Sequence, residues 1–132
     1  MHQQMCFMYC SVLAPGAGAA GVGTIVKTAR EFNGAHGITG LLVFDGERFC
    51  QYIEGPASAM QGLVEKLEAD SRHTDFTPLH FERRTDAGRR FPGWSMGYAD
   101  VGGDHTIDGM AQLAADEALE KLQALSRELD CY

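Results

Sequence analysis

The chain has 132 residues, 45% of them hydrophobic and 22% charged, which is the composition of an ordinary single globular domain. Its formal net charge of −7 disfavours direct binding to nucleic acid or to an anionic membrane surface. No apolar run approaches the roughly 20 residues of a membrane-spanning helix, and the N-terminus lacks the pattern of a signal peptide. The four cysteines form no C-x-x-C pair and favour a reduced, cytoplasmic protein without a zinc or thioredoxin-type site.

Hydrophobic periodicity divides the chain into strands and helices. Thr24 can cap the first helix and Asn33 before a glycine can end it, whereas Asp45 followed by a glycine is a strong hairpin signal. Pro56 marks a helix start, and Pro78 indicates an edge strand. The expected elements are, in chain order, a strand over 5–12, a flexible loop over 14–23, a helix over 24–32, strands over 38–44 and 47–54, a helix from 56, strands over 76–83 and 94–98, and a helical tail from 104.

This order predicts a ferredoxin-like α+β fold, in which an extra strand follows the βαββαβ core. We expect a five-stranded mixed sheet with two helices on one face and the C-terminal helical tail on the other. In that arrangement the first and third strands are neighbours, so Tyr9 and Gln51 face the two main helices. The opposite face is also apolar and needs cover from the tail or another subunit. It carries Cys6, Met8, Cys10, Cys50 and Tyr52.

Three uncharged polar side chains lie on predicted apolar faces, namely Tyr9, Asn33 and Gln51. A buried polar group needs a partner, and the sequence offers no evident one, so a ligand rich in donors and acceptors is the natural candidate. Each residue also has a structural explanation. Tyr9 fits a core tyrosine, Asn33 fits a left-handed helix end, and Gln51 fits a partly wet strand position.

The other candidate residues are also open to two explanations. Trp94 and Met96 fit ordinary core packing, and Arg72 with His73 fits a pair of cations at the end of the second helix, where the dipole favours them. The histidines show no metal-ligand spacing, and no pair of carboxylates is placed for acid–base chemistry. The residues therefore predict neither a metal site nor an enzyme.

The order and spacing of several short motifs resemble the BLUF family, the blue-light sensors that bind FAD. The motifs stand here as Y-C-S, N-G-A-H-G-I-T-G-L-L, F-C-Q-Y-I-E-G, D-S-R-H and R-R-F-P-G-W-S-M-G, between about Met5 and Ala99. The family's photochemical tyrosine and glutamine fall on Tyr9 and Gln51, and its flavin-ring asparagine falls on Asn33. The resemblance implies non-covalently bound FAD, with FMN and riboflavin as alternative flavins.

The resemblance also implies a role for each matching residue. Light drives the transfer of an electron and a proton from Tyr9 to the flavin, after which the hydrogen bonds of Gln51 are rearranged. Met96, beside the glutamine, carries the change into the last strand, and Trp94 is the family's mobile tryptophan. Further flavin contacts are expected from Arg30, Phe32, Asp70, Arg72 and His73, although Phe32 stands where polar residues also occur in the family.

By the same resemblance, residues 1–100 form the sensor domain and residues 101–132 form a helical cap or tail. About thirty residues after Asp100 are too few for an effector domain, so we expect a stand-alone photoreceptor that signals to an unidentified protein partner. One amphipathic helix shields only part of a five-stranded sheet, so a homodimer or larger homo-oligomer is expected. The apolar stripe of that helix is Leu119, Leu122, Leu125 and Leu129.

Two other functions fit the same architecture. An acylphosphatase-like hydrolase would need an arginine-bearing phosphate cradle near the first strand, but the loop after Ser11 has no Arg or Lys before Lys27. A colourless module that binds a small ligand or mediates oligomerisation is the second alternative. A flavin spectrum of the purified protein distinguishes the photosensor from both.

Overall fold

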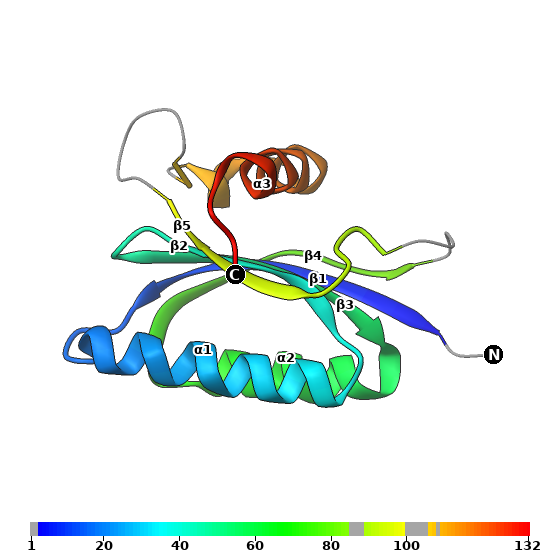
Figure 1. Cartoon of the computed structure of the whole chain (residues 1–132), viewed down its shortest axis with the longest axis horizontal. Helices are drawn as coiled ribbons and strands as arrows, with labels where there is room; N and C mark the ends of the chain where they lie inside the picture. The colour runs from blue at the N-terminus through cyan, green and yellow to red at the C-terminus, as the bar shows by residue number, and fades with distance from the viewer. Residues whose placement is uncertain (1–2, 85–88, 100–105, 108) are drawn as a thin grey trace.

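A computed structural model of the chain describes residues 3–84, 89–99, 106–107 and 109–132 (Figure 1). The elements follow the predicted order, and none of the helices in these ranges is long and apolar enough to cross a membrane. The elements are β1 (Gln4–Leu13), α1 (Gly18–Ala35), β2 (Thr39–Phe44), β3 (Arg48–Pro56), α2 (Ala57–Ala69), β4 (His73–Arg84), β5 (Trp94–Tyr98), the 3-10 helix η1 (Met110–Gln112) and α3 (Ala115–Glu128).

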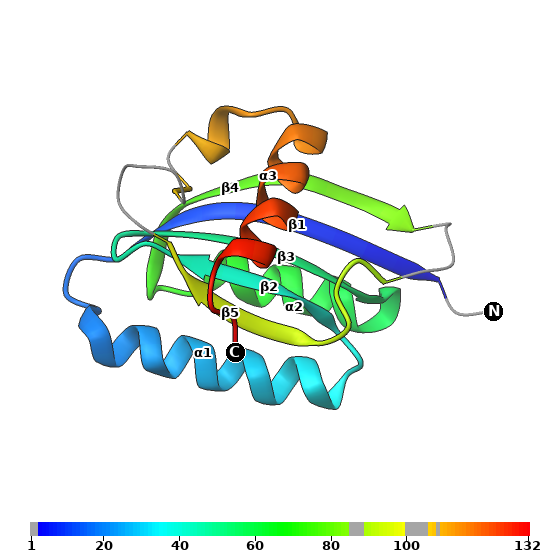
Figure 2. The same ribbon diagram turned by 45° about the horizontal axis from the view of Figure 1, so that its top comes forward.

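The strands form one mixed sheet in the order β4-β1-β3-β2-β5. β1 pairs antiparallel with β3 and β4, β2 pairs antiparallel with β3, and β2 pairs parallel with β5. Helices α1 and α2 cover one face of this sheet, and α3 lies across the other (Figure 1, Figure 2). The predicted ferredoxin-like α+β architecture is confirmed. Pro78 lies in β4 at the sheet edge, where its missing N–H costs least.

Helix α1 begins at Gly18 rather than Thr24, so the flexible loop expected over residues 14–23 is largely helical. Alanine has the highest helix propensity, and the burial of Val22 against the sheet offsets the cost of the glycines in this segment. Thr24 lies inside the helix, where its hydroxyl donates to the main-chain oxygen of Ala20 at 3.0 Å. The predicted capping role of Thr24 is therefore wrong.

The C-terminal end of α1 also differs from the prediction. The helix continues past Asn33 to Ala35, and the residue with a left-handed backbone is Gly37, at φ +69°. Asn33 lies in the last turn of α1 before the left-handed residue, and its main-chain oxygen accepts the N–H of Ile38 at 2.9 Å. The helix-end explanation of Asn33 is therefore wrong, and its side chain needs another role.

Helix α2 ends at Ala69, earlier than the dipole explanation of Arg72 and His73 requires. Asp70 adopts an extended backbone, and its Oδ1 accepts the main-chain N–H of Arg72 at 2.9 Å, which fixes the turn. His73 is already the first residue of β4. Neither residue belongs to α2, so the predicted position of Arg72 and His73 within the end of that helix is wrong.

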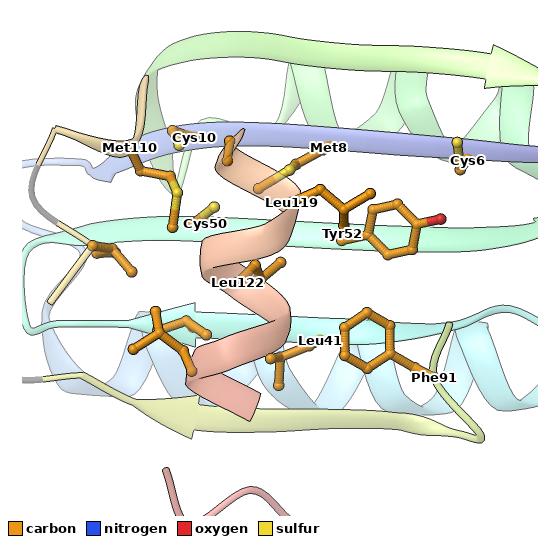
Figure 3. Close-up of a cluster of buried hydrophobic side chains, with 14 residues drawn as sticks. Cys6, Met8, Cys10, Leu41, Cys50, Tyr52, Phe91, Met110, Leu119 and Leu122 are labelled. Atoms are coloured by element: carbon orange, nitrogen blue, oxygen red, sulfur yellow. The ribbon is translucent and has the colours of Figure 1, made fainter. Parts of the chain in front are cut away.

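The outer face of the sheet is covered by the chain itself (Figure 3). Helix α3 and the segment before it pack on this face, with Met110, Leu119 and Leu122 buried over the strands. Expectations about Asp104 and the boundary at residue 100 lie outside the described residues. The sheet residues buried beneath are Cys6, Met8, Cys10, Leu41, Val43, Cys50 and Tyr52.

This cover removes the argument that led us to expect a homo-oligomer. Cys50 and Tyr52 are 0% exposed within a single chain, so the face does not need a second subunit to leave water. A single helix does not have to cover the whole sheet, because Phe91, Ile107 and Met110 pack on the same face together with α3. The oligomeric state itself stays a prediction.

Candidate functional site

Tyr9 and Gln51 lie opposite each other on β1 and β3 and are joined by a hydrogen bond. Gln51 Nε2 donates to the Tyr9 hydroxyl at 2.8 Å, and each residue is only 3% exposed. The same row of the sheet continues to Leu42 on β2 and then to Met96 on β5. The structure therefore places the two residues in contact, on the face that α1 and α2 cover.

Trp94 supplies the second hydrogen bond of Gln51. Its indole N–H donates to Gln51 Oε1 at 2.9 Å, although β5 lies two strands away from β3. In the neighbouring row the position between Ile53 and Trp94 belongs to Gly40, which contributes no side chain. A Cβ at residue 40 would lie 1.9 Å from the main-chain oxygen of Tyr52, so only glycine fits. This glycine leaves the path across β2 open for the indole.

Aromatic rings surround Tyr9. The ring centroids of Phe76, Phe7 and His73 lie 4.8, 5.7 and 5.9 Å from that of Tyr9. Burial raises the pKa of Tyr9 well above its ordinary value, although the hydrogen bond with Gln51 opposes this rise. The phenol therefore stays protonated in neutral solution, and it holds its proton at the oxygen that meets Gln51.

Met96 lies farther from Gln51 than the sequence analysis placed it. Leu42 stands between the two residues in the row across the sheet. Met96 is 1% exposed and belongs to a cluster with Phe44 and Phe49. Its main-chain N–H and carbonyl each form a hydrogen bond of 2.9 Å with Tyr132. Met96 is thus linked to Gln51 through Leu42, and to residues 131–132 through its main chain.

A cavity of about 410 Å³ lies beside Tyr9 and Gln51, between the sheet and the helices α1 and α2. Small-molecule sites commonly measure about 300–1,000 Å³, with apolar walls and a few polar groups that fix the ligand. We name it the helix-side cavity. Its other lining residues are Ile25, Thr28, Ala29, Phe32, Leu42, Leu63, Lys66, Leu67, Ala69, Asp70 and Arg72.

The charged residues of the helix-side cavity differ in whether their charge is already paired with that of another residue. Arg72 pairs with Asp70 through an Nη2–Oδ2 contact of 2.6 Å and an Nε–Oδ1 contact of 2.9 Å, and this pairing lowers the pKa of Asp70. Lys66 has no carboxylate partner among the described residues. Its ammonium lies 4.7 Å from the centre of the Phe32 ring. Lys66 is therefore the cation best placed to meet an anionic group, and it was missed in the sequence because it lies on the exposed side of α2.

The His73 ring packs against the Tyr9 ring, and His73 does not line the helix-side cavity. Its Nδ1 lies 2.8 Å from the Ser11 hydroxyl, and its Nε2 contacts the main-chain oxygen of Leu67. A carbonyl oxygen can only accept, so Nε2 carries a proton. His73 thus ties β1 to the end of α2 and holds its ring edge-on to Tyr9.

Asn33 is 1% exposed, yet its Oδ1 has no hydrogen-bond partner among the residues that the structure describes. It lines a second cavity, of about 440 Å³, that also contacts Thr39 and Trp94. Trp94 connects this cavity to the first through its bond to Gln51. An unpaired buried acceptor costs about 1–3 kcal/mol, which a bound N–H group would recover. The residues therefore fit an isoalloxazine ring, which combines an apolar face with an edge of N–H and carbonyl groups.

Arg30 lines the second cavity with Asn33 and reaches towards the C-terminal residues. Its guanidinium lies 5.5 Å from the centre of the Trp94 ring, and its Nη2 donates to the main-chain oxygen of Tyr132 at 2.8 Å. These contacts connect Arg30 with Trp94. A flavin contact of Arg30 stays a prediction.

The predicted site residues thus fall into three neighbouring groups. The helix-side cavity gathers Tyr9, Phe32, Gln51, Asp70 and Arg72. The second cavity gathers Arg30, Asn33 and Trp94. Met96 and His73 line neither of these two cavities. Met96 packs with Phe44 and Phe49, and His73 lies beside Ser11.

Comparison with known structures shows the same fold in BLUF proteins. The dark-state structure of BlrB is 29% identical in sequence, with a TM-score of 0.73, and the alignment covers 97% of this chain and 98% of that one. A Klebsiella pneumoniae BlrP1 structure in a complex with calcium and cyclic diGMP is also 29% identical, with a TM-score of 0.64. That alignment covers 92% of this chain and 28% of BlrP1.

Curated relatives match over a shorter stretch. The photoactivated adenylate cyclase subunit beta of Euglena longa is 41% identical over 56 residues, and its Euglena gracilis counterpart is 39% identical. These stretches span 42% of this chain and 6% of each cyclase subunit, so most of each cyclase has no counterpart here.

The family match is broader and covers the whole site. Residues 5–97 match the BLUF family, described as sensors of blue-light using FAD. That range contains Tyr9, Asn33, Gln51, Trp94 and Met96. This match favours the photosensor over the two alternatives, the acylphosphatase-like hydrolase and the colourless ligand-binding or oligomerisation module. The chain therefore belongs to the BLUF family of blue-light sensors that use FAD.

Proposed function

We propose that this photoreceptor switches through the hydrogen-bonded chain Tyr9–Gln51–Trp94. The observation that carries the proposal is that the Gln51 amide uses its two ends differently, donating to Tyr9 and accepting from Trp94. Bound flavin supplies the absorption of blue light and an acceptor for one electron and one proton. Tyr9 is the donor of both, because its protonated hydroxyl is buried and already bonded to Gln51.

A half-turn of the Gln51 amide would change both bonds at once. The carbonyl oxygen would then face the Tyr9 hydroxyl, which can donate to it. The amide nitrogen would face the indole N–H of Trp94, and two donors cannot bond to each other. Trp94 must then move, so a change at Tyr9 and Gln51 reaches the first residue of β5.

β5 leads from this switch to the C-terminal residues. Met96 is bonded in both directions to Tyr132, and Gly97 pairs with Cys131. A displacement of Trp94 also disturbs Arg30, which donates to Tyr132. The signal therefore leaves through residues 131–132 and alters a contact with a downstream protein, rather than driving a reaction.

The remaining proposals concern the flavin contacts and the setting. Asn33 and Phe32 hold the ring, while Lys66 and Arg72 face the phosphates of FAD, with Asp70 orienting Arg72. Residues 1–100 act as the sensor and residues 101–132 as its cap. The four cysteines, none of which forms a disulfide, support a cytoplasmic location. The exposed rings of Tyr98 and Tyr132, with centroids 6.4 Å apart beside β5, support a homo-oligomeric contact there.

Absorption spectra test the photosensor directly. The purified protein should be yellow, and blue light should shift its flavin bands reversibly to the red. Released flavin, identified by chromatography after denaturation, should be mainly FAD. A flavin-loaded protein with no reversible shift would contradict the proposed switch, and a colourless protein that takes up no added flavin would contradict flavin binding.

Asn33→Ala should weaken flavin binding without destabilising the flavin-free protein. Oδ1 has no partner in the structure, so removing it costs the flavin-free fold little. The hydrogen bond lost from the flavin is worth about 1–3 kcal/mol, which weakens binding about 5- to 150-fold. Fluorescence titration of the flavin measures the dissociation constant, and thermal melting of flavin-free protein measures stability.

Glu31→Ala is the matched control for this change, because Glu31 is exposed on the same helix. The control should bind flavin like the wild type. If Asn33→Ala keeps wild-type affinity but lowers the melting temperature of flavin-free protein, Asn33 serves the helix and not the flavin.

Lys66→Met should weaken the binding of FAD and FMN but not of riboflavin. Methionine keeps an aliphatic side chain over Phe32. It removes the charge of Lys66, which, unlike Arg72 in the helix-side cavity, has no carboxylate partner among the described residues. An exposed ion pair is worth about 0.2–1 kcal/mol, so we expect a loss of up to about fivefold for phosphorylated flavins. Titrations with all three flavins at low and high salt measure the effect, which salt should reduce.

Lys27→Met is the charge-matched control, because Lys27 is exposed on α1 and does not line either cavity. It should leave all three affinities unchanged. An equal loss for riboflavin and FAD in Lys66→Met would show that Lys66 acts through packing on Phe32 rather than through its charge.

A further inference from the structure

Two thiols face each other on the strands that carry Tyr9 and Gln51. Cys10 on β1 and Cys50 on β3 are register partners, one residue along from the Tyr9–Gln51 pair. Successive side chains of a strand point to opposite faces, so the thiols lie on the side of α3 (Figure 3). Both cysteines are free.

The register meets the main geometric requirement for a disulfide. Directly opposed residues on antiparallel strands have Cα atoms about 4.5–5.5 Å apart. Disulfides join residues whose Cα atoms lie about 4.4–6.8 Å apart. The influence of each thiol on the other, with Cys50 as hydrogen-bond donor to Cys10, is the largest cause of the shifts in their pKa values. A cross-link therefore needs rotation of the two side chains and no sliding of the strands.

The surroundings make the two thiols chemically different. The hydrogen bond from Cys50 lowers the pKa of Cys10, and the positive charge of Arg48 lowers it further. The same hydrogen bond, together with burial, raises the pKa of Cys50 well above its ordinary value. The thiolate is the reactive form of cysteine, so Cys10 is the nucleophile of the pair and Cys50 the second, resolving thiol.

Small molecules can reach Cys10 but not Cys50. Cys10 lines a cavity of about 220 Å³ whose wall also includes Arg48, Asp75 and Met110. Cys50 is 0% exposed. A water molecule takes up about 30 Å³, so the cavity has room for a hydroperoxide next to Cys10. Cys6 lies on the same face of β1, and its register partner on β3 is Glu54 rather than a cysteine.

We propose that Cys10 and Cys50 form a peroxide-oxidisable pair that closes a disulfide between β1 and β3. In a reducing compartment such disulfides are usually transient and sense redox state. The disulfide would join the two strands beside Tyr9 and Gln51. The protein would thus respond to peroxide at a site adjacent to the residues of the proposed light switch. The oxidation site itself does not depend on the proposed light switch.

The reaction has two balanced steps. The Cys10 thiolate attacks one oxygen of the hydroperoxide, the O–O bond breaks, and the departing oxygen takes a proton to leave as water or an alcohol. Cys10 is then a sulfenic acid, oxidised by two electrons. Cys50 gives up its proton and attacks the Cys10 sulfur, and the S–O bond breaks to release water. Two thiols and one hydroperoxide thus yield one disulfide, water, and water or an alcohol.

Mass spectrometry of the full-length, flavin-loaded protein tests the proposal. After hydrogen peroxide treatment in the dark, two thiols should resist alkylation, and peptide mapping should find Cys10 joined to Cys50. A thiol reductant should restore both. In Cys50→Ser the reaction should stop at a Cys10 sulfenic acid, trapped by dimedone. In Cys10→Ser oxidation should be at least about tenfold slower, since Cys50 is mostly un-ionised.

Cys6→Ser is the matched control and should cross-link like the wild type. The flavin spectrum of each variant shows whether it is folded, and Cys10→Ala and Cys50→Ala replace any serine variant that does not fold. A disulfide mapped to another pair, or equal oxidation rates in wild type and the Cys10 variants, would overturn the proposal. Full alkylation of all four thiols after peroxide treatment would overturn it as well.

Discussion

Replacing Gln51 with leucine should leave flavin bound and abolish the light-induced red shift. Leucine fills a similar volume, but it can neither donate to Tyr9 nor accept from Trp94. Each partner left unsatisfied costs about 1–3 kcal/mol, which the fold should survive because the apolar packing around residue 51 is kept. Absorption spectra before and after blue light measure the shift.

Gln61→Leu is the matched control, because Gln61 is exposed on α2 and should cycle like the wild type. Trp94 is the only tryptophan of the chain, so its fluorescence reports in the dark whether its bond to Gln51 is lost. A normal, reversible red shift in Gln51→Leu would rule Gln51 out as the switch.

The contact between Tyr9 and Gln51 could be predicted from the sequence because two simple rules fix it. The period of a strand sets which side chains share a face, and the ferredoxin-like order makes the first and third strands neighbours. The observed register then placed the two residues directly opposite each other. Local sequence patterns were sufficient to predict this contact, because it depends only on the period of each strand and on which strands are neighbours.

The reach of Trp94 to Gln51 could not be predicted in this way. It depends on Gly40, which leaves a gap in the row between two strands that are not neighbours in sequence. The burial of the Asn33 side chain could not be predicted either, because Asn followed by Gly has the same pattern in the last turn of a helix as at a left-handed helix end. Both features arise from tertiary packing, which a hydrophobic period does not record.

The C-terminal helix covers the outer face as predicted, but the rest of the cover was not predicted because it comes from distant parts of the chain. Phe91 and Met110 pack beside α3 over the sheet, and neither lies in a segment whose periodic pattern shows where it packs. The start of α1 failed for the opposite reason. A segment rich in glycine suggested a loop, but burial of Val22 and the propensity of the alanines made it helical.

Replacing Tyr9 with phenylalanine should give a folded flavoprotein that does not form the red-shifted state. The change removes one hydroxyl and keeps the ring that packs against Phe7 and Phe76. Gln51 loses one acceptor, at a cost of about 1–3 kcal/mol. Burial raises the pKa of Tyr9, so in the wild type the hydroxyl is protonated across neutral pH, and titration of Tyr9 should not alter the shift there.

Tyr98→Phe is the control, because Tyr98 is 52% exposed and lies outside both cavities. It should show the full red shift, which makes a loss in Tyr9→Phe specific to the buried hydroxyl. If Tyr9→Phe instead forms the red-shifted state with wild-type yield, the donor is another residue. Trp94 is then the first to test, because its indole N–H already meets Gln51, and Trp94→Phe should abolish the shift in the Tyr9→Phe background.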